Sequence, residues 1–180
     1  MKTPATTSLE KLQLFLVSNG IEAKREHPTQ DIPFSQLLIP LDTSKEKYDF
    51  ILQLFFFEDM LPSVKEKFQQ VANLQGLIFL ELLLPEERLF DLYRCVAAFN
   101  QLLPFGDFNV NEKGHPQGVF YRYTLPCLNQ EIDESLVVEL LHGLRFYINF
   151  LGSQIQRLVK ESLTLKELFN ESHADFQRSI

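Results

Sequence analysis

The sequence predicts an α+β fold in which helices pack on one twisted antiparallel sheet, in the order helix–βββ–helix–ββ–helix. Apolar residues alternate along three segments, as in half-buried strands: 48–57, 76–84 and 118–125. Other segments repeat apolar residues at helical spacing, and short turn-rich connections separate the strands. A chain of 180 residues fits a single domain. We therefore expect one domain over 1–180, with a core at about 8–163 and a C-terminal extension at 164–180.

The first helix is predicted from a capping-box pattern, Thr7-x-x-Glu10, which precedes apolar residues on one face. Those residues are Leu9, Leu12, Phe15 and Leu16. Asn19-Gly20 supplies a left-handed stop. Residues 21–33 are polar and interrupted by proline, so we expect mostly loop, with a possible short strand at 21–26.

Three strands are expected next, at 34–41, 48–57 and 76–84. In 48–57 one face is apolar, and the other begins polar and ends with Phe55 and Phe57, which suggests partial cover of that second side. A short helical insertion is predicted at 63–73, with Val64, Phe68 and Val71 as its apolar points. The strand at 76–84 has one continuous apolar face, made of Ile78, Leu80, Leu82 and Leu84.

A helix then begins at Pro85 and ends near Asn100. Its predicted buried stripe is Leu89, Leu92, Tyr93, Val96 and Ala97. A hairpin of strands at 105–110 and 118–125 follows. Arg122 lies between two tyrosines of the second strand and points to the opposite face. We expect it to form a structural ion pair if that face is covered, or to anchor a binding partner if it is exposed.

The last large element is a helix at about 133–162, with Asp133 as its N-cap. Its apolar seam has heptad spacing: Val137, Leu141, Leu144, Ile148, Leu151, Ile155 and Leu158. A second apolar row runs beside the seam: Leu136, Leu140, Tyr147 and Phe150. The combined face is wider than one seam needs, so apolar surface can remain after the core is filled. From Thr164 onward we expect one short helix and a polar end.

The charge balance limits the classes of partner. A net charge of −7 disfavours nucleic acid and anionic membrane surfaces, because both need a basic face. The longest apolar runs are too short to cross a bilayer, so we expect no membrane insertion. Cys95 and Cys127 do not make a disulfide framework. Together with a polar N-terminus that lacks an apolar signal region, this predicts a cytoplasmic protein.

No constellation for catalysis is found in the sequence. The four histidines, which are His27, His115, His142 and His173, lie in different predicted elements and lack a second ligand at metal-binding spacing. Phosphate-binding glycine loops and nucleophile motifs are also missing. The acidic cluster of Glu131, Asp133 and Glu134 is explained by its place at a helix start. We expect a non-catalytic protein without cofactor or metal.

One set of residues carries a family resemblance: Asn100, Pro104-Phe105-Gly106, Phe108, Tyr121-Arg122 and Leu125-Pro126. This set resembles the YbjN-like family, in particular its cyanobacterial members. The order of elements resembles the fold of type III secretion chaperones. The resemblance implies a small acidic cytosolic protein, usually a homodimer, that binds other polypeptides through sheet and helix surfaces. It supplies no catalytic residues. The insertion at 63–73 and the extended C-terminus depart from the secretion chaperones.

The sequence therefore predicts a chaperone-like or adaptor protein that binds another polypeptide as a homodimer. The predicted partner-binding residues are Phe55, Phe57, Arg122, Tyr147 and Phe150. The alternative is a small-molecule-binding regulatory domain with a pocket between helix and sheet. A large exposed apolar patch favours a protein partner. A closed cavity with a few converging polar groups favours a small ligand.

Overall fold

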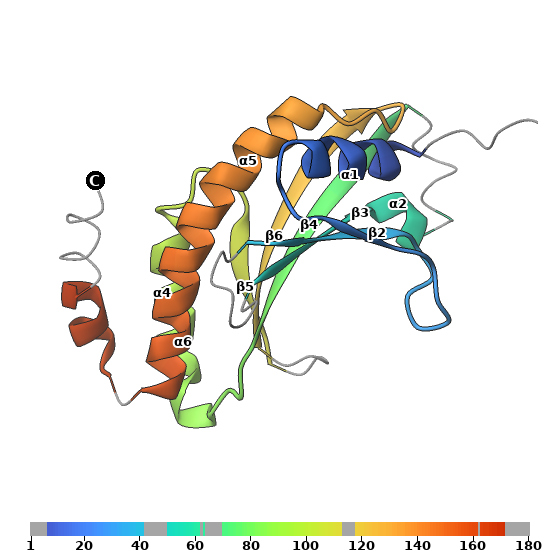
Figure 1. The fold of residues 1–180 in the computed structure, drawn as a ribbon. Helices are drawn as coiled ribbons and strands as arrows, with labels where there is room; N and C mark the ends of the chain where they lie inside the picture. Colours follow the sequence, from blue (N-terminus) through green and yellow to red (C-terminus); the bar gives the residue numbers. More distant parts are fainter. Residues whose placement is uncertain are drawn as a thin grey trace, which may run out of the picture.

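The structure, a computed structural model, describes residues 7–41, 50–61, 63, 70–112, 118–161 and 163–171. The predicted α+β class is confirmed: within these residues six strands form one open antiparallel sheet, with the order β1-β2-β3-β4-β6-β5. Figure 1 shows the helices grouped beside this twisted sheet.

The strands have bounds close to those predicted. They are β1 (Lys24–Glu26), β2 (Gln36–Pro40), β3 (Ile51–Phe56), β4 (Val71–Glu81), β5 (Asp107–Asn111) and β6 (Gly118–Leu128). The helices are α1 (Ser8–Ser18), α2 (Phe57–Met60), the 3₁₀ turn η1 (Glu86–Arg88), α4 (Leu89–Asn100), α5 (Glu134–Tyr147), the π-helical turn η2 (Ile148–Gly152) and α6 (Ser153–Lys160). Residues 165–171 form one further helix.

The predicted helix caps are present. Glu10 N donates to Thr7 Oγ1 at 3.3 Å and Leu136 N donates to Asp133 Oδ1 at 3.0 Å, so each cap satisfies one free N–H at a helix start. Gly20 follows α1 with a φ of +75°, the left-handed conformation expected for a glycine stop.

The prediction of a helical insertion over 63–73 is wrong at its C-terminal end. Val71 to Asn73 belong to β4, where they pair with Leu128 to Pro126 of β6. The two apolar points Val64 and Phe68 lie outside the described residues. The long pairing between β4 and β6 outweighs the weak local helical pattern, because each added strand residue gains ladder hydrogen bonds and cross-strand contacts.

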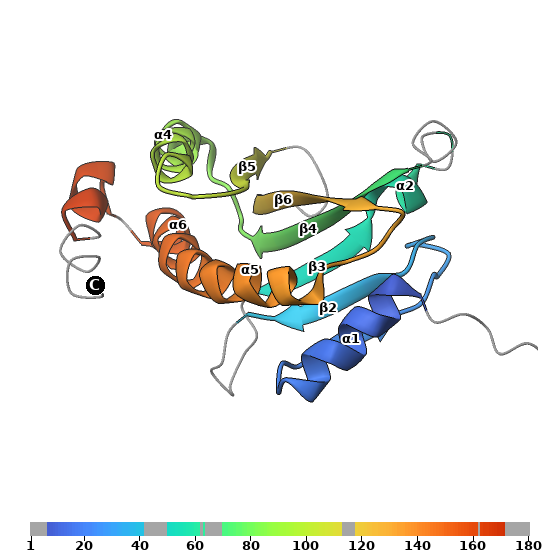
Figure 2. The ribbon, with the colours of Figure 1, turned by 90° about the horizontal axis from the view of Figure 1, so that it is seen from above.

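One face of the sheet forms the hydrophobic core and is called the core face. It is built from alternate residues whose register places them side by side, and all of these are buried: Leu37, Ile39, Leu52, Leu54, Leu74, Ile78, Leu80, Val119, Tyr121 and Phe108. Helices α1, α5 and α6 lie on this side of the sheet (Figure 1, above and to the left of the strands). Figure 2 shows α5 and α6 running as one rod beside α1.

The predicted seam of the long helix is confirmed. All seven of its residues are at most 4% exposed. The helical path continues from α5 to α6 through η2, where Gly152 lies against the sheet. A Cβ at Gly152 would stand 3.1 Å from Phe50 Cζ, so glycine allows the close approach of helix and strand there.

The buried stripe of α4 differs from the predicted one. Tyr93 is 46% exposed and Ala97 is also exposed, whereas Cys95 and Phe99 are buried together with Leu92 and Val96. The stripe is rotated because α4 packs against both β5 and α6. The helix at 165–171 adds buried Leu165 and Leu168, and the rings of Phe99 and Phe169 lie 6.0 Å apart. The core therefore extends past the predicted limit at 163.

Candidate interaction surface

The second face of the sheet has no helix of the described residues packed on its central part (Figure 1, lower right). We call this part the uncovered face. It consists of Leu38, Ile51, Gln53, Leu77, Phe79, Phe120 and Arg122, which are all partly or fully exposed. Antiparallel sheets that keep one face in water normally place polar residues there. Here five of the seven residues are apolar.

The strand register gathers these residues from four neighbouring strands. Leu38 lies beside Gln53, Gln53 beside Leu77, and Leu77 beside Arg122. Phe79 lies beside Phe120, with ring centroids 5.8 Å apart. The result is a largely apolar surface with an aromatic pair and one exposed arginine.

The β1–β2 connection covers one end of this side of the sheet. The rings of Phe34 and Phe55 lie 4.8 Å apart, and Phe55 is only 2% exposed. Gln36 is buried beside them and donates to Glu26 Oε2 at 3.0 Å. The partial cover expected from the aromatic end of the β3 segment is therefore present. Phe55 lies on the same side of β3 as Gln53, but it is packed against Phe34 and is too little exposed to contact a partner.

Arg122 is exposed on the uncovered face. It forms no ion pair with a carboxylate of the described residues. Asp107, its neighbour across the strands, instead accepts a hydrogen bond from the Asn109 side-chain amide. Arg122 therefore meets the condition of the second alternative, an exposed side chain that a binding partner can contact.

The other predicted partner-binding residues lie elsewhere. Phe57 begins α2 and is half-buried. Tyr147 and Phe150 lie on the helical rod, where both rings contact Phe146, at centroid distances of 5.2 and 6.4 Å. This rod covers the core face, so the structure brings Tyr147 and Phe150 together but separates them from Arg122.

Sequence reasoning missed Leu77, Phe79 and Phe120 as surface residues. The signal was available, because Leu77 and Phe79 alternate with buried Ile78 and Leu80 and make β4 apolar on both faces. Such a pattern fits a strand buried on both sides equally well. Only the placement of the helices shows which face is left open.

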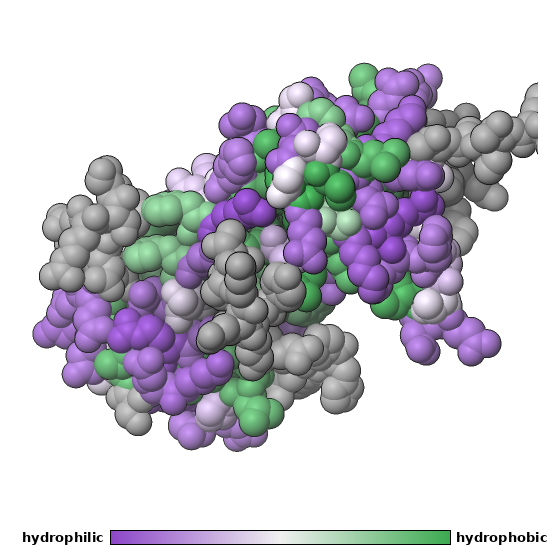
Figure 3. Space-filling view, in the orientation of Figure 1, coloured by the Kyte–Doolittle hydropathy of each residue, from purple (hydrophilic) through white to green (hydrophobic). Residues whose placement is uncertain are grey.

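A smaller group of exposed apolar residues lies on the helix side. The surface over α1 and α5 shows apolar side chains among polar ones (Figure 3). The exposed members there are Leu14 and Val17 of α1 and Leu136 of α5. Isolated exposed apolar residues are common on proteins, so this group is a weaker candidate than the uncovered face.

The described residues hold no cluster of metal-binding side chains. His27 and His142 are exposed, and His115 and His173 lie outside the described residues. Cys95 and Cys127 are free and buried. Burial, with a smaller contribution from Asp91, raises the pKa of the Cys95 thiol to about 12. A thiol that stays protonated at neutral pH is a poor nucleophile.

Glu58 is a buried carboxylate, with 1% of its surface exposed. Its oxygens accept hydrogen bonds from Asn73 N at 3.0 and 3.1 Å and from Asn73 Nδ2 at 2.6 Å. These bonds join α2 to the start of β4. Glu58 thus anchors the strand, and its partners all come from the fold itself.

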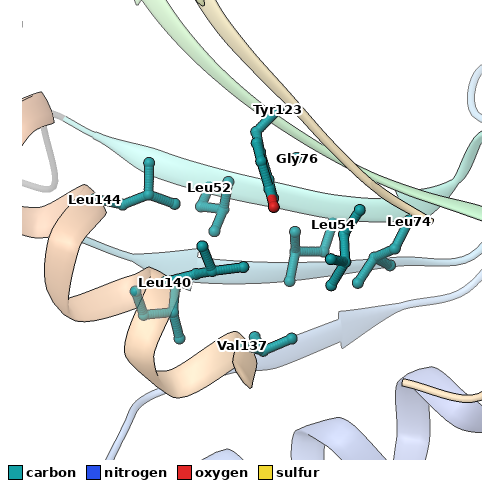
Figure 4. Close-up of a pocket in the computed structure, with 10 residues that line it drawn as sticks. Leu52, Leu54, Leu74, Gly76, Tyr123, Val137, Leu140 and Leu144 are labelled. Carbon is teal, nitrogen blue, oxygen red and sulfur yellow. The ribbon is translucent and has the colours of Figure 1, made fainter. Parts of the chain in front are cut away.

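A cavity lies between α5 and the core face, where the alternative function needs a pocket. Figure 4 shows it beneath Tyr123, lined otherwise by apolar residues such as Leu52, Leu54, Val137 and Leu140. The space is about 20 Å³, room for roughly one water molecule. Pockets for small-molecule ligands measure about 300 Å³ or more. The cavity lacks both this volume and a set of converging polar groups.

None of the helices in the described part of the chain combines the length and apolar composition needed to span a membrane.

Comparisons with known proteins give little further information. No protein-family model matches the chain, and no curated protein matches it in sequence. Among solved structures it is similar to an uncharacterized protein from Methanothermobacter thermautotrophicus, with a TM-score of 0.46 and 10% identity over 84% of this chain and 99% of that chain. A likeness of this strength assigns no function. The resemblance to YbjN-like proteins and secretion chaperones stays a prediction.

Proposed function

We propose that this chain is a non-catalytic, chaperone-like or adaptor protein that binds another polypeptide through the uncovered face. The observation that carries the proposal is a sheet face with apolar residues from four strands and no described helix on it. Aromatic residues and arginine are the types that contribute most to protein interfaces. Phe79, Phe120 and Arg122 supply both on adjacent strands.

The energy available from this face is moderate. Leu38, Leu77, Phe79 and Phe120 are each partly exposed, so completing their burial gains roughly 1 kcal/mol apiece at about 25 cal/mol per Å². Association itself costs about 4 kcal/mol or more in lost freedom of motion. We therefore expect a transient complex, in which the partner's own apolar residues and contacts to Arg122 supply the rest.

A homodimer belongs to the same proposal. Two copies can pack their uncovered faces about a twofold axis, as sheets do in sandwiches. The net charge of −7 on each copy opposes this pairing and favours a basic client instead. We also place the protein in the cytoplasm, because two unpaired, buried thiols suit a reducing compartment.

Site-specific crosslinking tests the proposal. A photo-crosslinking amino acid at Leu77 samples the uncovered face, and the same group at Leu14 of α1 is the matched control on an exposed helix. Activation in cells should attach a polypeptide at position 77, either a client or a second copy, and much less at position 14. Phe120→Ser should reduce the crosslink at position 77 severalfold. Equal yields at the two positions would refute the uncovered face as the binding surface.

Light scattering across a dilution series tests the homodimer. We expect a mass that falls with dilution, and a Phe120→Ser variant that remains monomeric over the same range. A monomeric mass for the unmodified chain at high micromolar concentration would exclude the homodimer and leave only the client-binding part of the proposal.

A further inference from the structure

The outer edge of β6 is only half paired. β5 pairs with Gly118 to Arg122, and β6 continues to Leu128. No strand of the described residues lies beside the remaining part, Tyr123 to Leu128, which we call the free edge. Thr124, Pro126 and Leu128 are all exposed there. The opposite end of the sheet, β1, is a three-residue strand of charged residues, a common protection against unwanted pairing.

The direction of the backbone groups on the free edge follows from Asn100. Its side chain accepts from Phe108 N at 2.8 Å and donates to Phe108 O at 3.0 Å, so both groups of Phe108 point away from β6. In an antiparallel pair, residues alternate between facing the partner and facing away. Asp107 and Arg122 therefore face each other, and by the same alternation Thr124, Pro126 and Leu128 face outward, beyond the end of β5.

Residue types at two positions agree with this assignment. Proline has no N–H and is found in strands where that group would face solvent, as at Pro126. Asn73 of β4 is the residue that pairs with Pro126 of β6. The N–H of Asn73 points away from β6 and donates to Glu58. The free edge consequently offers the N–H and C=O of Thr124, the C=O of Pro126 and the N–H of Leu128. Leu128 O already accepts from Glu131 N at 2.8 Å.

A groove of about 440 Å³ runs between the free edge and the start of α5. The chain reverses through Asn129 and Gln130, both with positive φ (53° and 61°), and this tight turn places α5 beside β6. Leu128 and Leu136 line the groove and are 68% and 42% exposed. The groove is thus partly apolar, and it borders the free edge at Leu125 to Leu128.

The charge of the groove is negative. Its lining includes Glu131, Asp133 and Glu134 and no lysine or arginine. The positive end of α5 offsets about half a unit of this charge, so the net charge of the groove stays negative. Positive charge on a ligand therefore strengthens its binding in this groove, and negative charge weakens it.

We propose that the groove binds an extended, basic polypeptide segment, which pairs with the free edge as an additional β-strand. The six residues of the free edge span about 17 Å, enough for a segment of five or six residues. Alternate side chains of the segment face the carboxylates, so lysine or arginine suits these positions. The intervening side chains lie on the opposite side of the segment, toward Leu128. The inference rests on the proposed function in taking a polypeptide as ligand, but it uses the sheet edge and not the uncovered face.

The first test is fluorescence anisotropy with labelled seven-residue peptides of alternating lysine and valine. The full chain should bind the lysine peptide, with affinity that falls as salt is raised, and should not bind the peptide with glutamate in place of lysine. Two further lysine peptides carry methyl groups on the backbone nitrogens of one edge or of the other. These two peptides should differ in affinity, because only one edge of the bound peptide pairs with β6. Equal binding of the two methylated peptides would overturn strand addition.

Protein variants locate the peptide. Glu131→Lys with Glu134→Lys should weaken binding about tenfold, and Glu134→Lys alone should weaken it by less. Glu139→Lys, a single substitution of the same kind on α5 outside the groove, should have little effect. Thr124→Pro removes the outward N–H and should weaken binding about tenfold, whereas Thr124→Val keeps it and should bind normally. Circular dichroism checks that each variant is folded. If Thr124→Pro unfolds the chain, the methylated peptides decide alone.

The two proposals fail separately. Phe120→Ser should leave lysine-peptide binding unchanged, because Phe120 lies on the uncovered face. If the lysine peptide does not bind while position 77 still crosslinks to a polypeptide, the groove inference is wrong and the proposed function stands. If the peptide binds through the groove and position 77 yields no crosslink, the uncovered face is refuted and the groove remains.

Discussion

The two faces of the sheet share the same strands but differ in what lies over them. On β3, Leu52 is 2% exposed on the core face, and its neighbour Ile51 is 37% exposed on the uncovered face. Both side chains are aliphatic, so their chemistry does not explain the difference. The core face is sealed by α1 and by the rod of α5 and α6, whereas, in the part of the chain that the structure describes, Phe34 covers one end of the other face. Apolar composition thus decides that a face can be buried, and the helices decide which face is.

The largest expected effect compares neighbouring residues on β3. Leu52→Ala should lower the free energy of unfolding by about 2–5 kcal/mol, because it leaves a cavity in a packed core. Ile51→Ala should cost about 1 kcal/mol or less, because part of the side chain is already in water. Denaturant melts of both variants measure the difference. Equal losses would mean that the second face is covered as fully as the first.

A second comparison tests how tightly the core side is packed. A Cβ at Gly106 would stand 2.2 Å from Tyr121 Oη and 2.6 Å from Arg122 O, and Gly106 has a φ of +67°. Gly106→Ala should therefore cost about 3 kcal/mol, from backbone strain and the clash together. Gly20 has a similar φ of +75° with no atom within 4 Å. Gly20→Ala should cost about 1 kcal/mol, and thermal melts that show equal losses would contradict the packing argument.

Asn100 caps the outer edge of β5 at Phe108. Asn100→Ala leaves the N–H and C=O of Phe108 without their side-chain partner and should cost about 1–3 kcal/mol. Asn100→Asp keeps the acceptor for Phe108 N but loses the donor to Phe108 O. Hydrogen exchange at Phe108 should accelerate in the alanine variant more than in the aspartate variant. Unchanged exchange in both would show that α4 alone protects this edge.

The last effect appears only at alkaline pH. Because the folded-state pKa of Cys95 is raised to about 12 from 9.0, the stabilisation is complete below about pH 9 and is lost as pH rises toward 12. The loss approaches about 1.4 kcal/mol per pH unit in this window. Cys95→Ala should start less stable at pH 7 but decline less steeply between pH 9 and 11. Parallel declines would place the alkaline sensitivity in other groups, such as Tyr121, whose pKa is also raised by burial.

Local features of the fold could be predicted because they depend on residues close in sequence. In the caps at Thr7 and Asp133, a side-chain oxygen accepts a hydrogen bond from the backbone N–H of the residue three positions later. The buried seam of the long helix follows from its own spacing, and the core face of β3 follows from strict alternation. For the same reason Arg122 could be assigned to the face opposite Tyr121 and Tyr123.

The candidate sites required more than local pattern. Val71 to Asn73 became strand because β6 is long enough to pair with them. Phe55 was expected to face a partner, but a loop from an earlier part of the chain brings Phe34 against it. Tyr147 and Phe150 were grouped with Arg122 in sequence reasoning, whereas the long helix crosses the other side of the sheet.

By itself, the sequence determined the α+β class, the order of the elements and the residues that each element can bury, because periodicity and capping are properties of neighbouring residues. Tertiary structure decided which apolar side of β4 remains in water, since Leu77 and Phe79 are as apolar as Ile78 and Leu80. It also decided that β6 extends past β5 beside the acidic start of α5. Both outcomes depend on which distant segments pack opposite each other, and a period of two along one strand carries no information about that choice.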